Sequence, residues 1–87
     1  MVTGRRRTKS EGRRGMLEDA ERRTYEIVDE MVRARKELGL TQAEVSRMAG
    51  CTQSNLSQIE RCKSRPSLRT VLMVLTPMGK TLKIVDK

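Results

Sequence analysis

The 87-residue sequence lacks histidine, phenylalanine and tryptophan, and Tyr25 is its only aromatic residue. Without histidine the chain has neither the usual general base near neutral pH nor the commonest metal ligand. With a single aromatic ring it has no stacking platform for the bases of single-stranded nucleic acid. A glycine-rich phosphate loop, a metal-ligand spacing and a nucleophile elbow are missing as well. We therefore expect a protein that is not an enzyme and that uses no metal or cofactor.

Cysteine and long apolar runs are also scarce. A helix of about nine residues between Cys51 and Cys62 would separate them by more than roughly 10 Å, too far for a disulfide. We expect Cys51 to be a small core residue and Cys62 to be a partly exposed thiol. The sequence has no run of the roughly 20 apolar residues that a membrane span needs, and no signal-peptide core after its basic start. This pattern predicts a cytoplasmic protein.

Positive charge is abundant and unevenly placed. The net charge is +8, and residues 1–15 hold six Lys or Arg and one Glu, whereas residues 16–87 hold thirteen basic and ten acidic side chains. The first 15 residues have almost no apolar side chains, which predicts a disordered basic tail before one small domain over residues 16–87. The tail is either an arm that contacts phosphates or a minor groove, or an inert extension. The basic balance favours a polyanionic partner.

A long first helix is expected over residues 17–38, where apolar side chains recur along one stripe until Gly39. Residues 16–37 hold seven acidic and five basic side chains, so this helix is negatively charged and poorly suited to DNA. Its acidic side is either a solvated face or a docking surface for a basic protein. The candidate docking residues are Glu18, Asp19, Glu21, Glu26, Asp29 and Glu30.

Residues 41–60, TQAEVSRMAGCTQSNLSQIE, have the pattern of two short helices joined by a tight turn. Thr41 and Glu44 fit a capping box, which predicts a helix from Gln42 until Gly50. Thr52 is placed to cap a second helix from Gln53 to Glu60. Leu56 and Ile59 would face inward in this second helix. Its outward side chains are short, polar and uncharged, and amides and hydroxyls of this kind can read base edges in a major groove.

These features together resemble the Xre-type helix-turn-helix of phage repressors and small bacterial regulators. Glutamine begins both helices, a glycine occupies the turn, and Ile-Glu ends the second helix. The resemblance covers roughly residues 31–78 and implies an all-α, four-helix domain. It also implies a homodimer that binds a palindromic double-stranded DNA operator, with half-sites about 34 Å apart. A four-helix domain used only for protein contacts is the alternative interpretation.

The resemblance and the residue types together suggest a role for each polar side chain. Gln53, Ser54 and Gln58 are the expected base-reading residues. The resemblance implies that Gln42 contacts a phosphate and braces Gln53, and that Arg35 pairs with Glu60. It also places a glycine where this chain has Cys62, which leaves the geometry of that turn open. The other expected phosphate contacts are Thr41, Asn55, Arg61, Lys63 and Arg65.

The C-terminal part of the sequence predicts a fourth helix and a short strand. Pro66 and Ser67 would begin the helix, and Pro77 would end it near Leu75. Residues 79–85 alternate like a strand, which would have to pair with its copy across a dimer axis. The expected dimer strand consists of Thr81, Leu82, Lys83, Ile84 and Val85.

The long acidic helix and the G-K-x-L ending also resemble the HigA-like and HipB-like antitoxins. This resemblance implies a partner toxin, a basic ribonuclease of the RelE/HigB-like kind, and autoregulation of the operon that encodes both. The alternative is a stand-alone, prophage-type repressor without a toxin partner.

Overall fold

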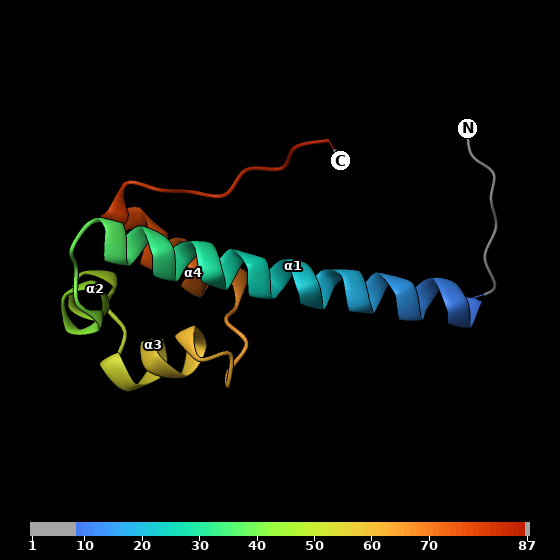
Figure 1. The fold of residues 1–87 in the computed structure, drawn as a ribbon, viewed down its shortest axis with the longest axis horizontal. Coiled ribbons are helices and arrows are strands. Elements are labelled where there is room, and N and C mark those ends of the chain that lie inside the picture. The colour runs from blue at the N-terminus through green and yellow to red at the C-terminus, as the bar shows by residue number, and fades with distance from the viewer. Residues whose placement is uncertain (1–8, 87) are drawn as a thin grey trace.

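The structure is a computed structural model that describes residues 9–86, with side chains from residue 15 onward. Within this range the chain forms four α-helices and a short 3-10 turn. They are α1 (Lys9–Glu37), α2 (Gln42–Ala49), α3 (Gln53–Glu60), α4 (Leu68–Leu75) and η1 (Thr76–Met78). Figure 1 shows α2, α3 and α4 gathered around the C-terminal part of α1, while the first part of α1 extends beyond them. The predicted all-α, four-helix architecture is confirmed.

The hydrophobic core lies where the last half of α1 meets the three short helices. Val28 and Met31 of α1 are buried, whereas Met16 and Leu17 on its first half are exposed. The predicted apolar stripe of α1 is therefore covered along only half of its length, because the short helices do not reach its beginning. The main buried cluster consists of Met31, Val45, Ala49, Leu56, Val71, Val74, Leu75 and Met78.

Helix α1 begins at Lys9, eight residues before the expected start at residue 17. No proline interrupts residues 9–16, so the hydrogen-bond ladder of the packed half can continue backward through Gly12 and Gly15. Of the predicted disordered tail, residues 1–8 lie outside the described part of the chain, and residues 9–15 are helical. Between residues 9 and 86, no helix is both long enough and apolar enough to cross a membrane.

The predicted C-terminal strand is not present in residues 80–86, which are extended but form no strand. A strand requires a neighbouring strand for its ladder of hydrogen bonds, and within the described range no other segment offers one. The side chain of Ile84 is 98% exposed. The expectation that Thr81–Val85 pair with a second copy therefore stays a prediction.

The short helices begin and end as their local sequence predicts. Thr41, Thr52 and Ser67 each accept a hydrogen bond from the backbone N–H three residues later, at 3.0, 3.0 and 3.1 Å. Helix α4 ends at Leu75, and Pro77 lies in the 3-10 turn that follows it. These three caps and the end of α4 are confirmed.

The end of α3 has the left-handed backbone that glycine provides at the ends of α1 and α2. Cys62 has a φ of 60°, close to the 71° of Gly39 and the 78° of Gly50. Its N–H donates to the carbonyl of Ile59, and the N–H of Lys63 donates to that of Gln58, both at 2.9 Å. This pair of bonds is a Schellman motif, so the turn is kept although cysteine replaces the usual glycine.

We expect Cys62→Gly to raise the free energy of unfolding by about 0.5 to 1 kcal/mol. The left-handed backbone costs a residue with a Cβ atom roughly 1–2 kcal/mol, and the greater freedom of glycine in the unfolded chain offsets part of that gain. Urea denaturation would measure the difference. Cys62→Ala is the matched control, because it removes the thiol but keeps the Cβ atom. Equal stabilisation by both substitutions would contradict the explanation from backbone strain.

Candidate nucleic-acid interface

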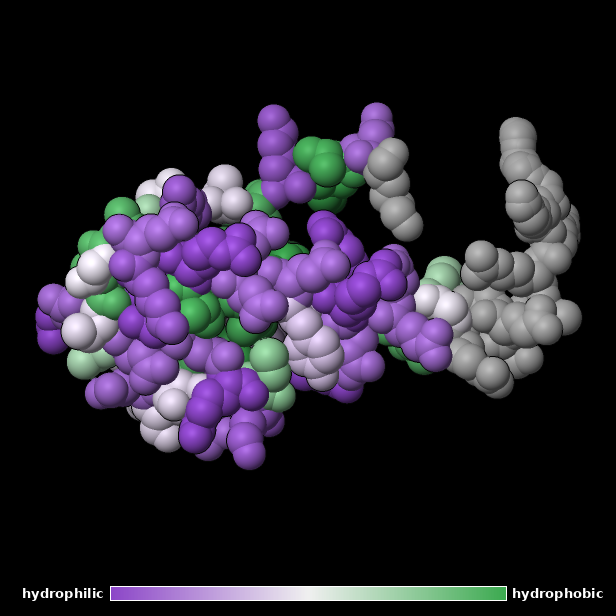
Figure 2. All heavy atoms as spheres, viewed as in Figure 1, coloured by the Kyte–Doolittle hydropathy of each residue, from purple (hydrophilic) through white to green (hydrophobic). Residues whose placement is uncertain are grey.

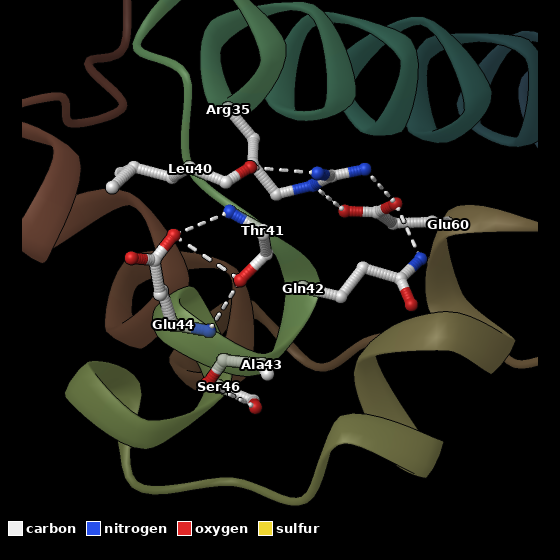
Figure 3. Close-up of polar contacts among 8 residues, drawn as sticks. All are labelled: Arg35, Leu40, Thr41, Gln42, Ala43, Glu44, Ser46 and Glu60. Carbon is white, nitrogen blue, oxygen red and sulfur yellow. Dashed lines mark hydrogen bonds and ion pairs between the residues drawn. The ribbon is translucent and has the colours of Figure 1, made fainter.

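The turn between α1 and α2 is fixed by the predicted capping box. The Glu44 side chain accepts a hydrogen bond from the Thr41 N–H at 2.8 Å, and the Thr41 hydroxyl oxygen accepts one from the Glu44 N–H at 3.0 Å (Figure 3). The hydrogen bond from the Thr41 N–H, followed by one that the Thr41 hydroxyl donates to the same carboxylate oxygen at 3.1 Å, lowers the pKa of Glu44 below its ordinary value. The carboxylate is therefore charged at neutral pH, and its negative charge interacts favourably with the positive N-terminal end of the α2 dipole.

Helix α3 buries one edge and presents a polar edge to solvent. Leu56 is 0% exposed and Ile59 is 1% exposed, so the helix is held by its apolar side. The predicted base-reading residues Gln53, Ser54 and Gln58 are all exposed. An α-helix with its side chains is about 10–12 Å in diameter, which suits a major groove about 12 Å wide. Figure 1 shows α3 along the edge of the domain below α1.

A nearly buried ion pair joins α1 to α3. Arg35 Nε and Nη2 donate to the two carboxylate oxygens of Glu60 at 2.7 and 2.9 Å, and Arg35 Nη1 donates to the carbonyl of Leu40 at 2.8 Å (Figure 3). The side chains of Arg35 and Glu60 are 12% and 8% exposed. This arrangement is the bidentate pair that the family resemblance implies.

Gln42 connects helix α2 to this ion pair. Its amide nitrogen donates to Glu60 Oε1 at 2.9 Å (Figure 3). The resemblance implies that Gln42 braces Gln53, whereas this structure places its amide on Glu60. Burial alone would raise the pKa of Glu60, but the hydrogen bonds from Arg35 and Gln42 and the nearby positive charge outweigh it and lower that pKa. Glu60 is thus an ionised carboxylate that three helices share.

The basic loop between α3 and α4 divides into two groups of side chains. Arg61 and Lys63 are exposed at the end of α3. Arg65 forms an ion pair with Glu21 of α1. The sequence prediction grouped Arg65 with the phosphate contacts and did not identify this pair, because its members are 44 residues apart. Only a prediction of how α1 packs against the loop could have found it.

The acidic residues of α1 are partly neutralised within the helix itself. Arg22 pairs with Asp19 and lies 3.8 Å from Glu26, and Arg23 pairs with Glu26 at 2.8 Å. The other predicted docking residues are Glu18, Asp29 and Glu30, which are exposed, and Glu21, which pairs with Arg65. Figure 2 shows hydrophilic residues over most of this side of α1. The structure therefore brings the acidic residues together on one helix, but with basic side chains interspersed.

The described residues contain no group of three His, Cys, Asp or Glu side chains that could hold a metal ion. The two cysteines are free thiols, with Cys51 half-buried and Cys62 exposed, as the sequence predicts.

We expect Arg35→Ala to lower the free energy of unfolding at neutral pH by about 3 kcal/mol. The substitution leaves the Glu60 carboxylate nearly buried without its main cation, and breaking such a pair is costly. Urea denaturation would measure the loss. Arg33→Ala is the matched control, because Arg33 lies on the same helix but is exposed.

The loss in Arg35→Ala should shrink as the pH is lowered. The lowered pKa of Glu60 stabilises the fold fully above the ordinary carboxyl pKa of 4.5, and this stabilisation is lost as the pH falls through the folded-state pKa. Once Glu60 is protonated, the variant no longer contains a stranded charge. An energy difference that stays constant from neutral pH down to about pH 3 would contradict this account.

Comparisons with known proteins agree with this geometry. A family model described as Helix-turn-helix matches residues 32–85. An uncharacterized HTH-type transcriptional regulator of Haemophilus influenzae is 36% identical over 59 residues, which cover 68% of this chain and 60% of that protein. The chain thus spans about 60% of the length of this curated relative. A chain of a toxin-antitoxin module from Streptococcus pneumoniae has a similar structure, with a TM-score of 0.62 and 36% identity over 92% of this chain and 81% of that chain.

Proposed function

This chain belongs to the helix-turn-helix family, and we propose that it is a sequence-specific DNA-binding regulator that also serves as the antitoxin of a toxin–antitoxin pair. The observation that carries the DNA-binding part is the exposed polar edge of α3 on a helix whose position is fixed. Its inward side is buried, and its last residue is held by Arg35 and Gln42. Rigid placement is what allows a short helix to present base-reading side chains in one orientation.

In the proposed complex, α3 lies in the major groove of double-stranded DNA. Gln53, Ser54 and Gln58 would contact base edges, where a glutamine amide can form two hydrogen bonds with adenine. Phosphates would be contacted around this helix by exposed or half-exposed side chains, which position the protein without reading sequence. The proposed phosphate contacts are Thr41, Gln42, Asn55, Arg61 and Lys63.

The proposed DNA-binding unit is a homodimer. Two recognition helices about 34 Å apart would enter successive major grooves and read a palindromic operator. Support comes from the C-terminal segment, where Ile84 and Val85 are apolar and exposed and where residues 9–86 offer the backbone no strand to pair with. A second copy of the segment would cover both features.

The antitoxin role is supported by the likeness to a toxin-antitoxin module and by the acidic extension of α1. This extension is the part of α1 before residue 32, where the family match begins. Its exposed acids would attract a basic partner, and a ribonuclease of the RelE/HigB-like kind has that chemistry because it must bind RNA. A stand-alone repressor is the second candidate, and the arginines that neutralise part of the acidic face favour it.

We expect Gln53→Ala to weaken binding to a selected operator by about 1 to 3 kcal/mol, with little effect on random duplex DNA. The lost amide would have contacted a base edge, which random DNA does not present in the right register. Fluorescence anisotropy with both duplexes would measure the two affinities.

Lys63→Ala is the contrasting variant for this experiment. A phosphate contact should weaken both duplexes equally and flatten the salt dependence by about one unit. Equal losses on both duplexes for Gln53→Ala would refute base reading by this residue.

For the antitoxin role, we expect the tagged chain to co-purify from DNase-treated lysate with one basic protein in stoichiometric amount. That protein should cleave RNA once the two are separated. A variant with Glu18→Lys and Asp29→Lys tests the surface, because both exposed acids lie on the same stripe of α1. It should lose the partner and keep DNA binding. Recovery of the homodimer alone would refute the antitoxin role and leave the stand-alone repressor.

A further inference from the structure

The first half of α1 touches the DNA-binding unit through an ion pair that the family match does not include. Glu21 belongs to the extension before residue 32, whereas Arg65 lies within the matched region. Both side chains also line a shallow, largely apolar hollow between α1 and the loop. The rest of its lining consists of Leu17, Ala20, Thr24 and Tyr25. The extension therefore reaches the same loop that carries Arg61 and Lys63.

Arg65 has two possible counter-charges when DNA is bound. Arg65 lies four residues after Arg61 in the same loop, and we propose that Arg61 and Lys63 contact phosphates. In the free protein, however, its guanidinium is bonded to the Glu21 carboxylate. The Glu21 carboxylate already neutralises the single positive charge of this guanidinium, so a phosphate competes with it for that charge.

We propose that Glu21 withholds Arg65 from the DNA backbone, so that the α1 extension limits the number of phosphates that the protein neutralises. A guanidinium that already has a counter-charge contributes little to the release of DNA counterions. The pair is exposed, with 77% of the Arg65 side chain and 43% of the Glu21 side chain accessible. It is therefore weak and easily exchanged, which suits a contact that another charge can displace.

This arrangement makes Glu21 a positioning residue for DNA binding rather than a residue that contacts DNA. A cationic side chain that takes the Glu21 carboxylate frees Arg65 for a phosphate. Binding of a basic partner on the first half of α1 and binding of DNA on α3 therefore support each other, and by linkage each changes the affinity of the other by the same factor. The inference rests on the proposed DNA binding.

The test uses the full chain and a fluorescent duplex of random sequence, with affinities measured over a range of KCl concentrations. The variants are Glu21→Gln, Arg65→Gln and the double variant. Glu18→Gln is the matched control, because it removes the same charge one turn away on the same helix. Glu18 is exposed and takes part in no ion pair within residues 15–86. Circular dichroism would check that every variant is folded.

We expect Glu21→Gln to bind the duplex about threefold more tightly than Glu18→Gln and to steepen the plot of log K against log[KCl] by about 0.9 units, which corresponds to one further phosphate. Arg65→Gln should leave the wild-type slope nearly unchanged. In the double variant the gain should disappear, because the guanidinium that Glu21 withholds is no longer present.

Two outcomes would overturn the inference while leaving the proposed function intact. Glu21→Gln and Glu18→Gln could behave alike, which would mean that only the overall charge matters. Arg65→Gln could flatten the wild-type slope by a full unit, which would mean that Arg65 already contacts a phosphate. Failure of the proposed function gives a different result, because the wild-type chain would then bind a selected operator no more tightly than the random duplex.

Discussion

The position of α3, the proposed recognition helix, depends on the contact of Arg35 with Glu60. An eight-residue helix is too short to be stable in water by itself, so its tertiary contacts must hold it. Leu56 and Ile59 anchor its apolar side, but apolar contact is not directional and would allow the helix to rotate or slide. The bidentate pair fixes the C-terminal end of α3 against α1, and Gln42 fixes the same carboxylate against α2. Three helices thus meet at one ionised group.

This polar contact matters more because the core is small and contains no aromatic side chain. The buried cluster is made of Val, Leu, Met and Ala residues, which bring less contact area than aromatic rings. At the ends of the short helices, hydroxyl caps and Schellman motifs form hydrogen bonds with backbone N–H and C=O groups that have no partner within the helix. The turn that ends α3 keeps its left-handed backbone at Cys62, although this conformation is costly for a residue with a Cβ atom.

The parts of the fold that depend on local signals could be predicted from the sequence, and the parts that depend on distant contacts could not. Thr41 and Thr52 mark the starts of α2 and α3 because their side chains bond groups only three residues away. The Arg35–Glu60 pair followed from the family resemblance, because no local pattern links positions 25 residues apart. The pair between Glu21 and Arg65 was missed for the same reason. The C-terminal strand stays a prediction for the dimer and is absent from residues 80–86 of the single chain, because alternation yields a strand only where another strand is available.

Helix α1 connects the acidic surface of its own first half with the exposed polar edge of α3 in a fixed geometry. It carries Arg35, which orients α3, and it also carries the acidic residues from Glu18 onward. Glu21 and Arg35 are fourteen residues apart, which is about 21 Å along one continuous helix. A partner bound to the extension would therefore stand at a set distance and angle from the recognition helix, without a flexible linker between them. Because of this rigidity, the proposed exchange of Arg65 between Glu21 and a phosphate would relate the occupation of the α1 surface to the charge that the protein presents to DNA.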